Sequence, residues 1–266
     1  MTFSCHLSLH CFQTFRDLLN CFDLTDKNPL YFVISRNGLR IYSSYASCFV
    51  GRVDIRRDFF QRYECQEDGD DFACHVSKFL DITADLSNKC FDFSELSITM
   101  GADRRLVIKA SVESVVVITM LLDTLVVDQP VLDLGFQSNN LQAVASVSPE
   151  LFKTALAQLP AASFRSTLTF DKTFIRVESG TVCTIKKSPN VESLLVHGPN
   201  RCSRSYRGDL FKKALKPVSR ATALELVRMR VDNNGILQVL YCFKHYTEST
   251  FFEVTILPEF VEADDV

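Results

Sequence analysis

The pattern of apolar and polar positions at the start of the chain changes from the period of a strand to that of a helix. Residues Phe3–His10 alternate between apolar and polar side chains, which is typical of a strand with one buried face. From Cys11 to Phe22 the apolar residues recur every three or four positions, which predicts an amphipathic helix. The chain therefore begins with a strand that runs directly into a short helix.

The same succession of strand and short helix is predicted four times. The later helices are expected at Ser77–Leu86, from Pro149 to about Leu159, and within Arg201–Arg220. Each helix couples an apolar Phe to a neighbouring cation, in the pairs Phe15 with Arg16, Phe79 with Lys78, Phe152 with Lys153, and Phe211 with Lys212. Long β-meanders fill the intervals, and two of their hairpins are expected at Asn37-Gly38, as a type I′ turn, and at Asn234-Gly235. We interpret the chain as four β-rich modules whose helices share one face of curved antiparallel sheets.

This pattern predicts an α+β protein of two domains with two modules each. Residues 123–136 mix Leu, Val and Asp with one Pro, and we interpret them as the connector between the domains. The predicted bounds are 1–122 for the N-terminal domain, 137–258 for the C-terminal domain and 259–266 for an acidic tail.

The stretch Arg201–Arg220 holds seven basic residues against one acid, Asp209. Its centre predicts a short helix that buries Leu210, Phe211, Ala214 and Leu215, and Pro217 is expected to end it. The opposite face presents Lys212, Lys213 and Lys216. A single helix of this kind could simply be a solvated lysine face. Its fourfold repetition favours a shared cationic surface, lined by Arg16, Lys78, Lys153 and the three lysines, that could contact a phosphate backbone.

Composition limits how such a surface could be used. The net charge is −3, divided as −5 in residues 1–130 and +2 in residues 131–266, so nucleic-acid contact must come from a local patch. Ten cysteines lack any CxxC pair and no signal peptide is recognised, which predicts reduced, mostly buried thiols in an intracellular protein. The longest apolar run, Val115–Leu122, is too short to span a bilayer, so no membrane association is expected.

Two groups of residues could carry a different chemistry. Cys5, His6, His10 and Cys11 are of metal-ligating types, but on a strand His6 and His10 lie about 13 Å apart, so no metal site is expected. The acids Glu67, Asp68, Asp70 and Asp71 could bind a divalent ion, although adjacent acids around a glycine are typical of a solvated turn. No phosphate-binding loop or nucleophile motif is present, so we expect no cofactor and no enzymatic activity.

Four segments carry a resemblance to a known family: ALKPVSRATALELVRMRVDNNGILQVLYCF at Ala214–Phe243, RNGLRIYSS at Arg36–Ser44, TMLLDTLVVDQP at Thr119–Pro130, and ILPEF at Ile256–Phe260. Through these segments the chain resembles the eukaryotic sliding clamps, the family of the proliferating cell nuclear antigen. Within that family it resembles most the Rad-one subunit of the heterotrimeric checkpoint clamp, the nine-one-one complex.

The resemblance implies a non-catalytic subunit of a ring that encircles double-stranded DNA in the nucleus, with the helices lining the hole. It implies a DNA-damage checkpoint and DNA-repair function, with Rad-nine-like and Hus-one-like neighbours, a clamp loader, and recruited checkpoint and repair proteins. The residues it places near phosphates, without base recognition, are Arg16, Lys153, Lys212, Lys213, Lys216 and Arg220. Lys78 belongs to the same set by position, but Asp81 and Asp85 make its helix face near neutral. The alternatives are a homotrimeric replicative clamp and a metal-dependent 3′-5′ exonuclease built on the same fold.

Two predicted edge strands are the expected subunit contacts. They supply Val115, Val116, Val117, Ile118, Thr119 and Met120 in the first domain, and Thr181, Val182, Thr184 and Lys186 in the second. An unpaired edge as apolar as the first would invite aggregation, which also argues for a partner. The resemblance further implies a groove for extended client peptides beneath the connector, near Tyr42, Val126, Leu257 and Pro258.

Overall fold

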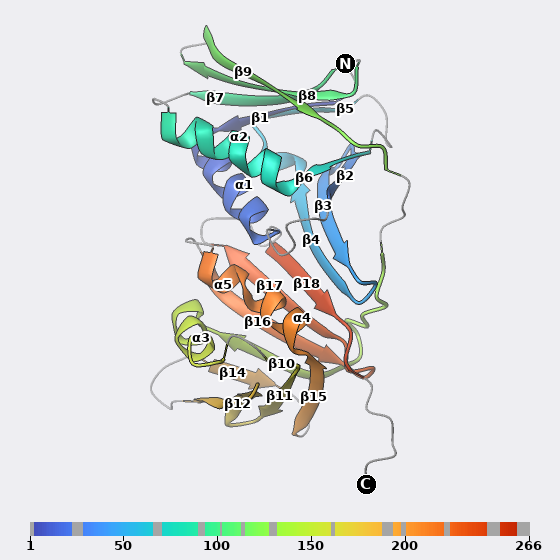
Figure 1. Cartoon of the computed structure of the whole chain (residues 1–266), viewed down its shortest axis with the longest axis vertical. Coiled ribbons are helices and arrows are strands. Elements are labelled where there is room, and N and C mark those ends of the chain that lie inside the picture. The colour runs from blue at the N-terminus through green and yellow to red at the C-terminus, as the bar shows by residue number, and fades with distance from the viewer. Residues whose placement is uncertain are drawn as a thin grey trace. The chain divides into compact units, whose positions relative to one another are not determined.

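A computed structural model gives the structure of the chain (Figure 1). It describes residues 3–22, 29–65, 71–89, 94–101, 103–112, 115–127, 132–160, 163–187, 194–197, 201–220, 224–243 and 251–259. The contacts divide the chain into two compact units, the first made of residues 1–43, 52–131 and 246–250, and the second of residues 44–51, 132–245 and 251–266. Each unit is described separately.

The first unit contains antiparallel strands and two α-helices. Its five-stranded sheet has the order β5-β1-β7-β8-β9, formed by Arg62–Cys65, Phe3–Ser8, Glu95–Met100, Arg105–Val112 and Val115–Asp123. A second run of strands, β4-β3-β2-β6, comprises Phe49–Arg56, Gly38–Tyr45, Pro29–Ser35 and Phe72–His75. The helices are α1 (Leu9–Cys21) and α2 (Val76–Lys89), with a short 3-10 turn at Arg57–Phe59. Both helices contact the five-stranded sheet, as Figure 1 shows.

Aromatic rings join the helices of the first unit to its second run of strands. Phe15 of α1 meets Phe79 of α2 edge-on, with ring centroids 6.2 Å apart. Phe79 lies 6.1 Å from Phe32 of β2, which stacks on Phe72 of β6 at 4.6 Å. All four side chains are buried, so the amphipathic faces of both helices close one continuous core.

The second unit repeats the arrangement with shorter helices. One run of strands has the order β14-β10-β16-β17-β18, formed by Leu194–His197, Leu141–Val147, Leu224–Asp232, Leu237–Phe243 and Phe251–Ile256. A four-stranded sheet, β13-β12-β11-β15, comprises Val182–Lys186, Phe174–Glu178, Arg165–Asp171 and Cys202–Arg207. The helices are α3 (Pro149–Leu156), α4 (Gly208–Leu215) and α5 (Pro217–Arg220). Helix α3 contacts β13, β16 and α5, whereas α4 contacts β11, β15 and β18.

Two fully buried tyrosines organise the core of the second unit. Tyr206 of β15 lies 6.0 Å from the ring of Phe211 in α4, and its hydroxyl donates to the carbonyl of Gly235 at 3.0 Å. Tyr241 of β17 packs near Phe252, and its hydroxyl donates to the carbonyl of Ala214. Each tyrosine thus supplies an apolar ring to the core and a hydroxyl to a buried backbone oxygen. Mostly antiparallel sheets with few helices agree with an α+β clamp fold.

Some local predictions are wrong. The hairpin of β2 and β3 forms, but Ser35 pairs with Gly38, so the turn residues are Arg36 and Asn37, neither of which has a positive φ. The predicted type I′ turn at Asn37-Gly38 is therefore wrong. Gly38 has φ +141°, and a Cβ there would lie 2.1 Å from the carbonyl oxygen of Ile55, so close packing requires the glycine. The sequence around Phe59–Cys65 also predicts one strand, but Phe59 ends the 3-10 turn and β5 begins only at Arg62.

Candidate nucleic-acid interface

Each of the four predicted helices forms directly after a strand and buries the expected phenylalanine. Phe15, Phe79, Phe152 and Phe211 are at most 1% exposed. The strands that lead into them are β1, β6, β10 and β15. The sequence predicts a strand at Ser193–His197 as the one before the fourth helix, but β15 lies between that segment and α4. The succession of strand, helix and buried Phe is confirmed.

Helix α4 begins where it does because of a close backbone contact. The amide of Gly208 donates to the carbonyl of Phe164 at 2.8 Å, and a Cβ on Gly208 would lie 2.0 Å from the carbonyl oxygen of Ser163. Only glycine allows this approach. The contact holds the first turn of α4 against the segment that leads into β11, so the direction of the helix is set at its first residue.

An ion pair also marks the start of α4. Arg207 donates two hydrogen bonds to the carboxylate of Asp209, at 3.2 and 2.9 Å. Partial burial favours a higher pKa for Asp209, but the hydrogen bond and charge of Arg207, the amide of Leu210 and the charge of Lys213 outweigh it and lower the pKa. The carboxylate lies in the first helical turn, where the helix dipole also favours a negative charge.

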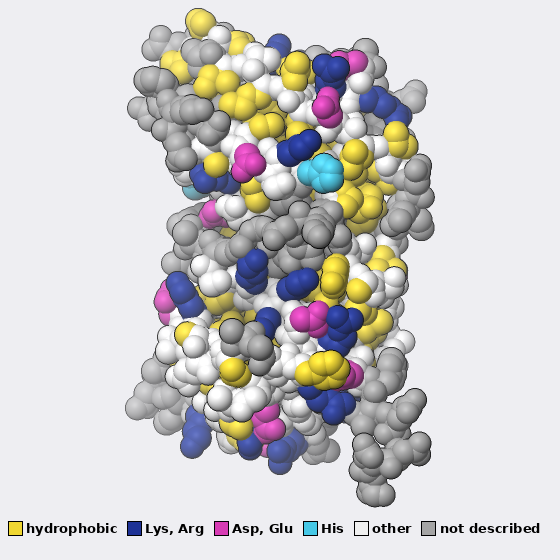
Figure 2. All heavy atoms as spheres, viewed as in Figure 1, with side chains coloured by type: hydrophobic (Ala, Val, Ile, Leu, Met, Phe, Trp, Pro, Cys, Tyr) yellow, Lys and Arg dark blue, Asp and Glu magenta, His cyan; other side chains and the backbone are white. Residues whose placement is uncertain are grey.

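The two faces of α4 are as predicted. Leu210, Phe211, Ala214 and Leu215 are buried, whereas Lys212, Lys213 and Lys216 are partly exposed. The ammonium of Lys212 donates to the carbonyl of Pro160, and that of Lys213 lies 4.0 Å from the ring centroid of Tyr45. In Figure 2, Lys and Arg side chains gather over the region of the second unit where α4 and α5 lie. The lysines therefore form a fixed cationic surface on a buried apolar helix.

Pro217 was expected to end the basic helix, and α4 does end at Leu215. Pro217 is also the first residue of α5, a position that suits a residue without an amide hydrogen. Val218 of α5 is buried, and Arg220 is the last residue of this short helix. The side chain of Arg220 lies outside the described part of the structure.

The other predicted cations differ in exposure. Lys153 of α3 is exposed and Arg16 of α1 is partly exposed. On α2 both Lys78 and Asp81 are exposed, three residues apart on the same helix. The side chain of Asp85 is not described. These side chains belong to two separately described units, so their arrangement as one surface remains a prediction.

The predicted contact strands lie at sheet edges. Strand β9 ends the order of the five-stranded sheet, and its exposed apolar side chains include Val115, Val116 and Leu121, at 65%, 49% and 58% exposure. Strand β13 ends the four-stranded sheet, with Thr181, Val182, Thr184 and Lys186 exposed beside it or on it. Ile118 and Met120 are half-buried, Thr119 is exposed, and the side chain of Val117 is not described.

The residues of the predicted peptide groove fall in different units. Tyr42 and Val126 belong to the first unit, and Leu257 and Pro258 to the second. Tyr42 is 2% exposed and stacks on Tyr31 at 5.0 Å, whereas Val126 is 66% exposed. The groove itself remains a prediction.

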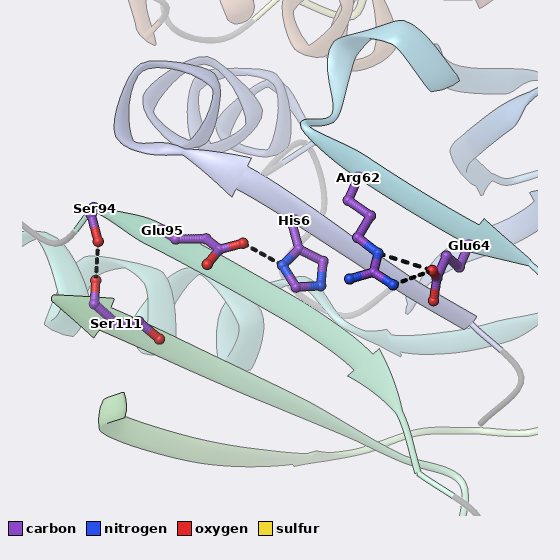
Figure 3. A network of polar contacts seen from close by, with 6 residues as sticks. All are labelled: His6, Arg62, Glu64, Ser94, Glu95 and Ser111. Carbon is purple, nitrogen blue, oxygen red and sulfur yellow. Dashed lines mark hydrogen bonds and ion pairs between the residues drawn. The ribbon is translucent and has the colours of Figure 1, made fainter. Parts of the chain in front are cut away.

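The metal-ligating residue types near the N-terminus point in different directions. The side chain of His6 contacts the carboxylate of Glu95 on the neighbouring strand β7, as Figure 3 shows. Cys5 is buried, and burial raises its pKa, which disfavours the thiolate that a metal needs. Glu67, Asp68 and Asp70 lie outside the described residues, and Asp71 accepts a hydrogen bond from the amide of Ile34. Among the described residues, no group of three or more His, Cys, Asp or Glu could hold a metal ion.

One cationic cluster was not found from the sequence. A cavity of about 750 Å³ in the first unit is lined by Arg36, Arg56, Arg57 and Arg62 together with polar and aromatic neighbours. Two of these arginines are paired, Arg56 with Asp58 and Arg62 with Glu64. The cluster combines a hairpin turn, the 3-10 turn and β5, so no local periodicity could have indicated it.

Comparison with known proteins agrees with this picture. The family described as repair protein Rad1/Rec1/Rad17 matches residues 4–243, which is most of the chain and includes all four strand-and-helix units. No curated protein matches the sequence.

Proposed function

The chain belongs to the Rad1/Rec1/Rad17 family of repair proteins, the checkpoint-clamp family with a fold like that of the proliferating cell nuclear antigen, and on that premise we propose that it encircles DNA as a subunit of a ring. Within the ring it holds checkpoint and repair proteins at damaged DNA in the nucleus. Its neighbours are a Rad-nine-like and a Hus-one-like subunit, and a clamp loader places the ring on DNA.

The observation that carries this proposal is the cationic surface of α4. Lys212, Lys213 and Lys216 project from a helix whose opposite face is buried and whose start is fixed by Gly208. Lysines placed in this way can contact phosphates without base recognition. With Lys153, Arg16 and Arg220 they supply weak, salt-sensitive contacts, while closure of the ring supplies the tethering.

The two sheet edges support an assembly with other subunits. An antiparallel edge with the exposed valines of β9 offers unpaired backbone groups and apolar surface to another chain. Strand β13 offers a second, chemically different edge. In the proposed ring each edge pairs with a different neighbour, as a head-to-tail arrangement requires.

The family also bears on catalysis and location. Clamp subunits of this family are generally non-catalytic scaffolds, and we extend that property to this chain. The family acts in DNA repair, which supports action in the nucleus. No helix in the described part of the chain has the length and apolar character needed to cross a bilayer.

Charge reversal on α4 tests the proposal. The tagged chain is purified from cells with its bound subunits, and the assembly is loaded onto nicked circular DNA. We expect Lys212→Glu, Lys213→Glu and Lys216→Glu together to weaken loading of the assembly onto DNA at moderate salt, while the assembly itself still forms. Unchanged loading in the variant would overturn the DNA-facing role of α4.

A matched control carries the same change in charge elsewhere on the second unit. Lys172→Glu, Lys187→Glu and Arg228→Glu alter exposed positions outside α3, α4 and α5, and we expect loading to persist. Light scattering on the purified chain distinguishes a subunit of a heterotrimeric ring from a homotrimeric replicative clamp. A mass near the 30.1 kDa of one chain supports the heterotrimeric subunit, whereas a stable mass of three chains would overturn it.

A further inference from the structure

A cavity lies among helices α3, α4 and α5, and contact with DNA phosphates does not require it. Its volume is about 480 Å³, within the range of ligand pockets. It is lined by Lys153, Leu156, Ala157, Leu159, Pro160, Lys212, Lys213, Leu215, Lys216, Val218 and Ser219. The lining thus combines four lysines with a set of mostly aliphatic side chains, and it contains no acidic residue.

The lysines give the cavity a positive rim. The ammonium of Lys212 donates to the carbonyl of Pro160, which fixes one cation beside the apolar lining. An ammonium has three donors, so it can still donate to a ligand. Lys153 contributes an exposed cation from α3. Four positive charges without an acid in the lining favour an anionic occupant.

The apolar lining limits the identity of that occupant. Leu156 and Leu159 are half-buried, and Leu215 and Val218 are buried beside them. A phosphate backbone gains nothing from aliphatic surface, because its favourable contacts are with cations and hydrogen-bond donors. Burial of apolar surface stabilises a complex only when the ligand also brings an apolar group. The complementary ligand is therefore both acidic and aliphatic.

We propose that this cavity binds an acidic peptide segment of a partner protein through one or two leucine-type side chains. The aliphatic group enters between α3 and α5, and the flanking carboxylates pair with the lysines of the rim. The same lysines face DNA in the proposed function, so the segment and the duplex compete for them. This competition rests on the proposed function, whereas binding of the peptide does not.

A defined pair of probes tests the binding. The first is a fluorescein-labelled octapeptide of sequence DDELLEDD, and the second is DDESSEDD, which has the same charge without the leucines. Fluorescence anisotropy with the folded chain is expected to show binding at least about tenfold tighter for the leucine peptide. Equal affinities would overturn the proposal, because charge alone would then explain binding.

Variants locate the site. Leu159 is half-buried, and Leu159→Ser is expected to remove most of the difference in affinity between the two peptides. Leu125→Ser, a 41% exposed position in the first unit, is the matched control and should leave that difference intact. Lys153→Gln with Lys212→Gln is expected to weaken both peptides about tenfold or more. Thermal unfolding confirms that each variant is folded, and a folded Leu159→Ser protein that keeps the full difference would place the peptide elsewhere.

A duplex competition assay separates this proposal from the proposed function. With the assembled clamp, a 30-base-pair duplex is expected to displace the leucine peptide, and Leu159→Ser is expected to leave DNA retention unchanged. Peptide binding without any DNA retention would refute the proposed function and preserve the peptide site. DNA retention together with equal binding of the two peptides would refute the peptide site and preserve the proposed function.

Discussion

The hydroxyl of Tyr241 donates a hydrogen bond to the backbone carbonyl of Ala214, which joins strand β17 to the last turn of α4. Both residues are completely buried. The last carbonyls of a helix have no partner within the helix, so this tyrosine supplies a donor to one carbonyl in the last turn of the helix that carries the three lysines. The cationic surface is thereby tied to the centre of the sheet.

Removal of this hydroxyl should destabilise the protein without changing its charge. Tyr241→Phe leaves the carbonyl of Ala214 buried without its partner, and we expect a loss of about 1–3 kcal/mol in the free energy of unfolding. Urea denaturation followed by circular dichroism measures it. Tyr31→Phe is the control, since the Tyr31 hydroxyl makes no hydrogen bond with a described residue. A loss below about 0.5 kcal/mol for Tyr241→Phe would show that another donor replaces the Tyr241 hydroxyl at the carbonyl of Ala214.

A methyl group at the start of α4 should also be costly. In Gly208→Ala the added Cβ lies 2.0 Å from the carbonyl oxygen of Ser163, so the backbone must move. We expect a loss of about 1–3 kcal/mol in the free energy of unfolding. In Gly101→Ala the nearest atom is instead a side-chain oxygen of Asp103, which can rotate away, so that variant should be nearly neutral. Equal losses in the two variants would contradict the structural explanation.

The four helices should contribute unequally to DNA contact. Lys153 is exposed on α3, whereas Lys78 on α2 has the exposed Asp81 one turn away. For the assembled clamp, we expect Lys153→Ala to reduce the slope of log affinity against log salt concentration by about 0.9. Lys78→Ala should reduce it much less. If Lys78→Ala reduced the slope as much as Lys153→Ala or more, the negative charge of Asp81 would not offset the positive charge of Lys78.

The Arg207–Asp209 pair should make stability depend on pH in the acid range. The pKa of Asp209 is lowered in the folded chain, so its contribution is present above the unfolded pKa, near 4, and is lost as pH falls through the folded value. The pair is half-exposed, which limits its contribution to about 0.2–1 kcal/mol. Asp209→Asn should lower stability at pH 7 and become equivalent to the parent near pH 2. The test is urea denaturation at both pH values, and an equal difference at the two would reject the ion pair as its cause.

The helical units could be predicted because their information is local. The spacing of Phe15 within α1 and of Phe211 within α4 sets which face is buried, and the neighbouring cation then falls on the other face. The start of α3 at Pro149 follows from the same local rules, although Ser148 makes no side-chain capping bond. Packing against the rest of each unit does not override these local helical preferences.

Other features depend on contacts between distant segments. The turn at Arg36-Asn37 follows from the approach of Gly38 to the carbonyl of Ile55, which no dipeptide rule contains. The cavity beside α4 combines Leu156 and Val218 from different helices. In strand β15, Cys202 and Tyr206 are buried on the same face, but the arginines between and after them weaken the alternation of apolar and polar positions that indicates a strand.

Strand β1 precedes both of its sheet neighbours along the chain, one of them by a long interval. It lies between β5 and β7 in its sheet, and β7 ends at Met100. At ribosomal elongation rates, its second neighbour is synthesised on the order of ten seconds after β1 itself. During that interval the apolar side chains of Phe3, Cys5 and Leu7 have no completed sheet to cover them. We therefore expect the cellular yield of this chain to depend on how fast the residues between β1 and β7 are translated.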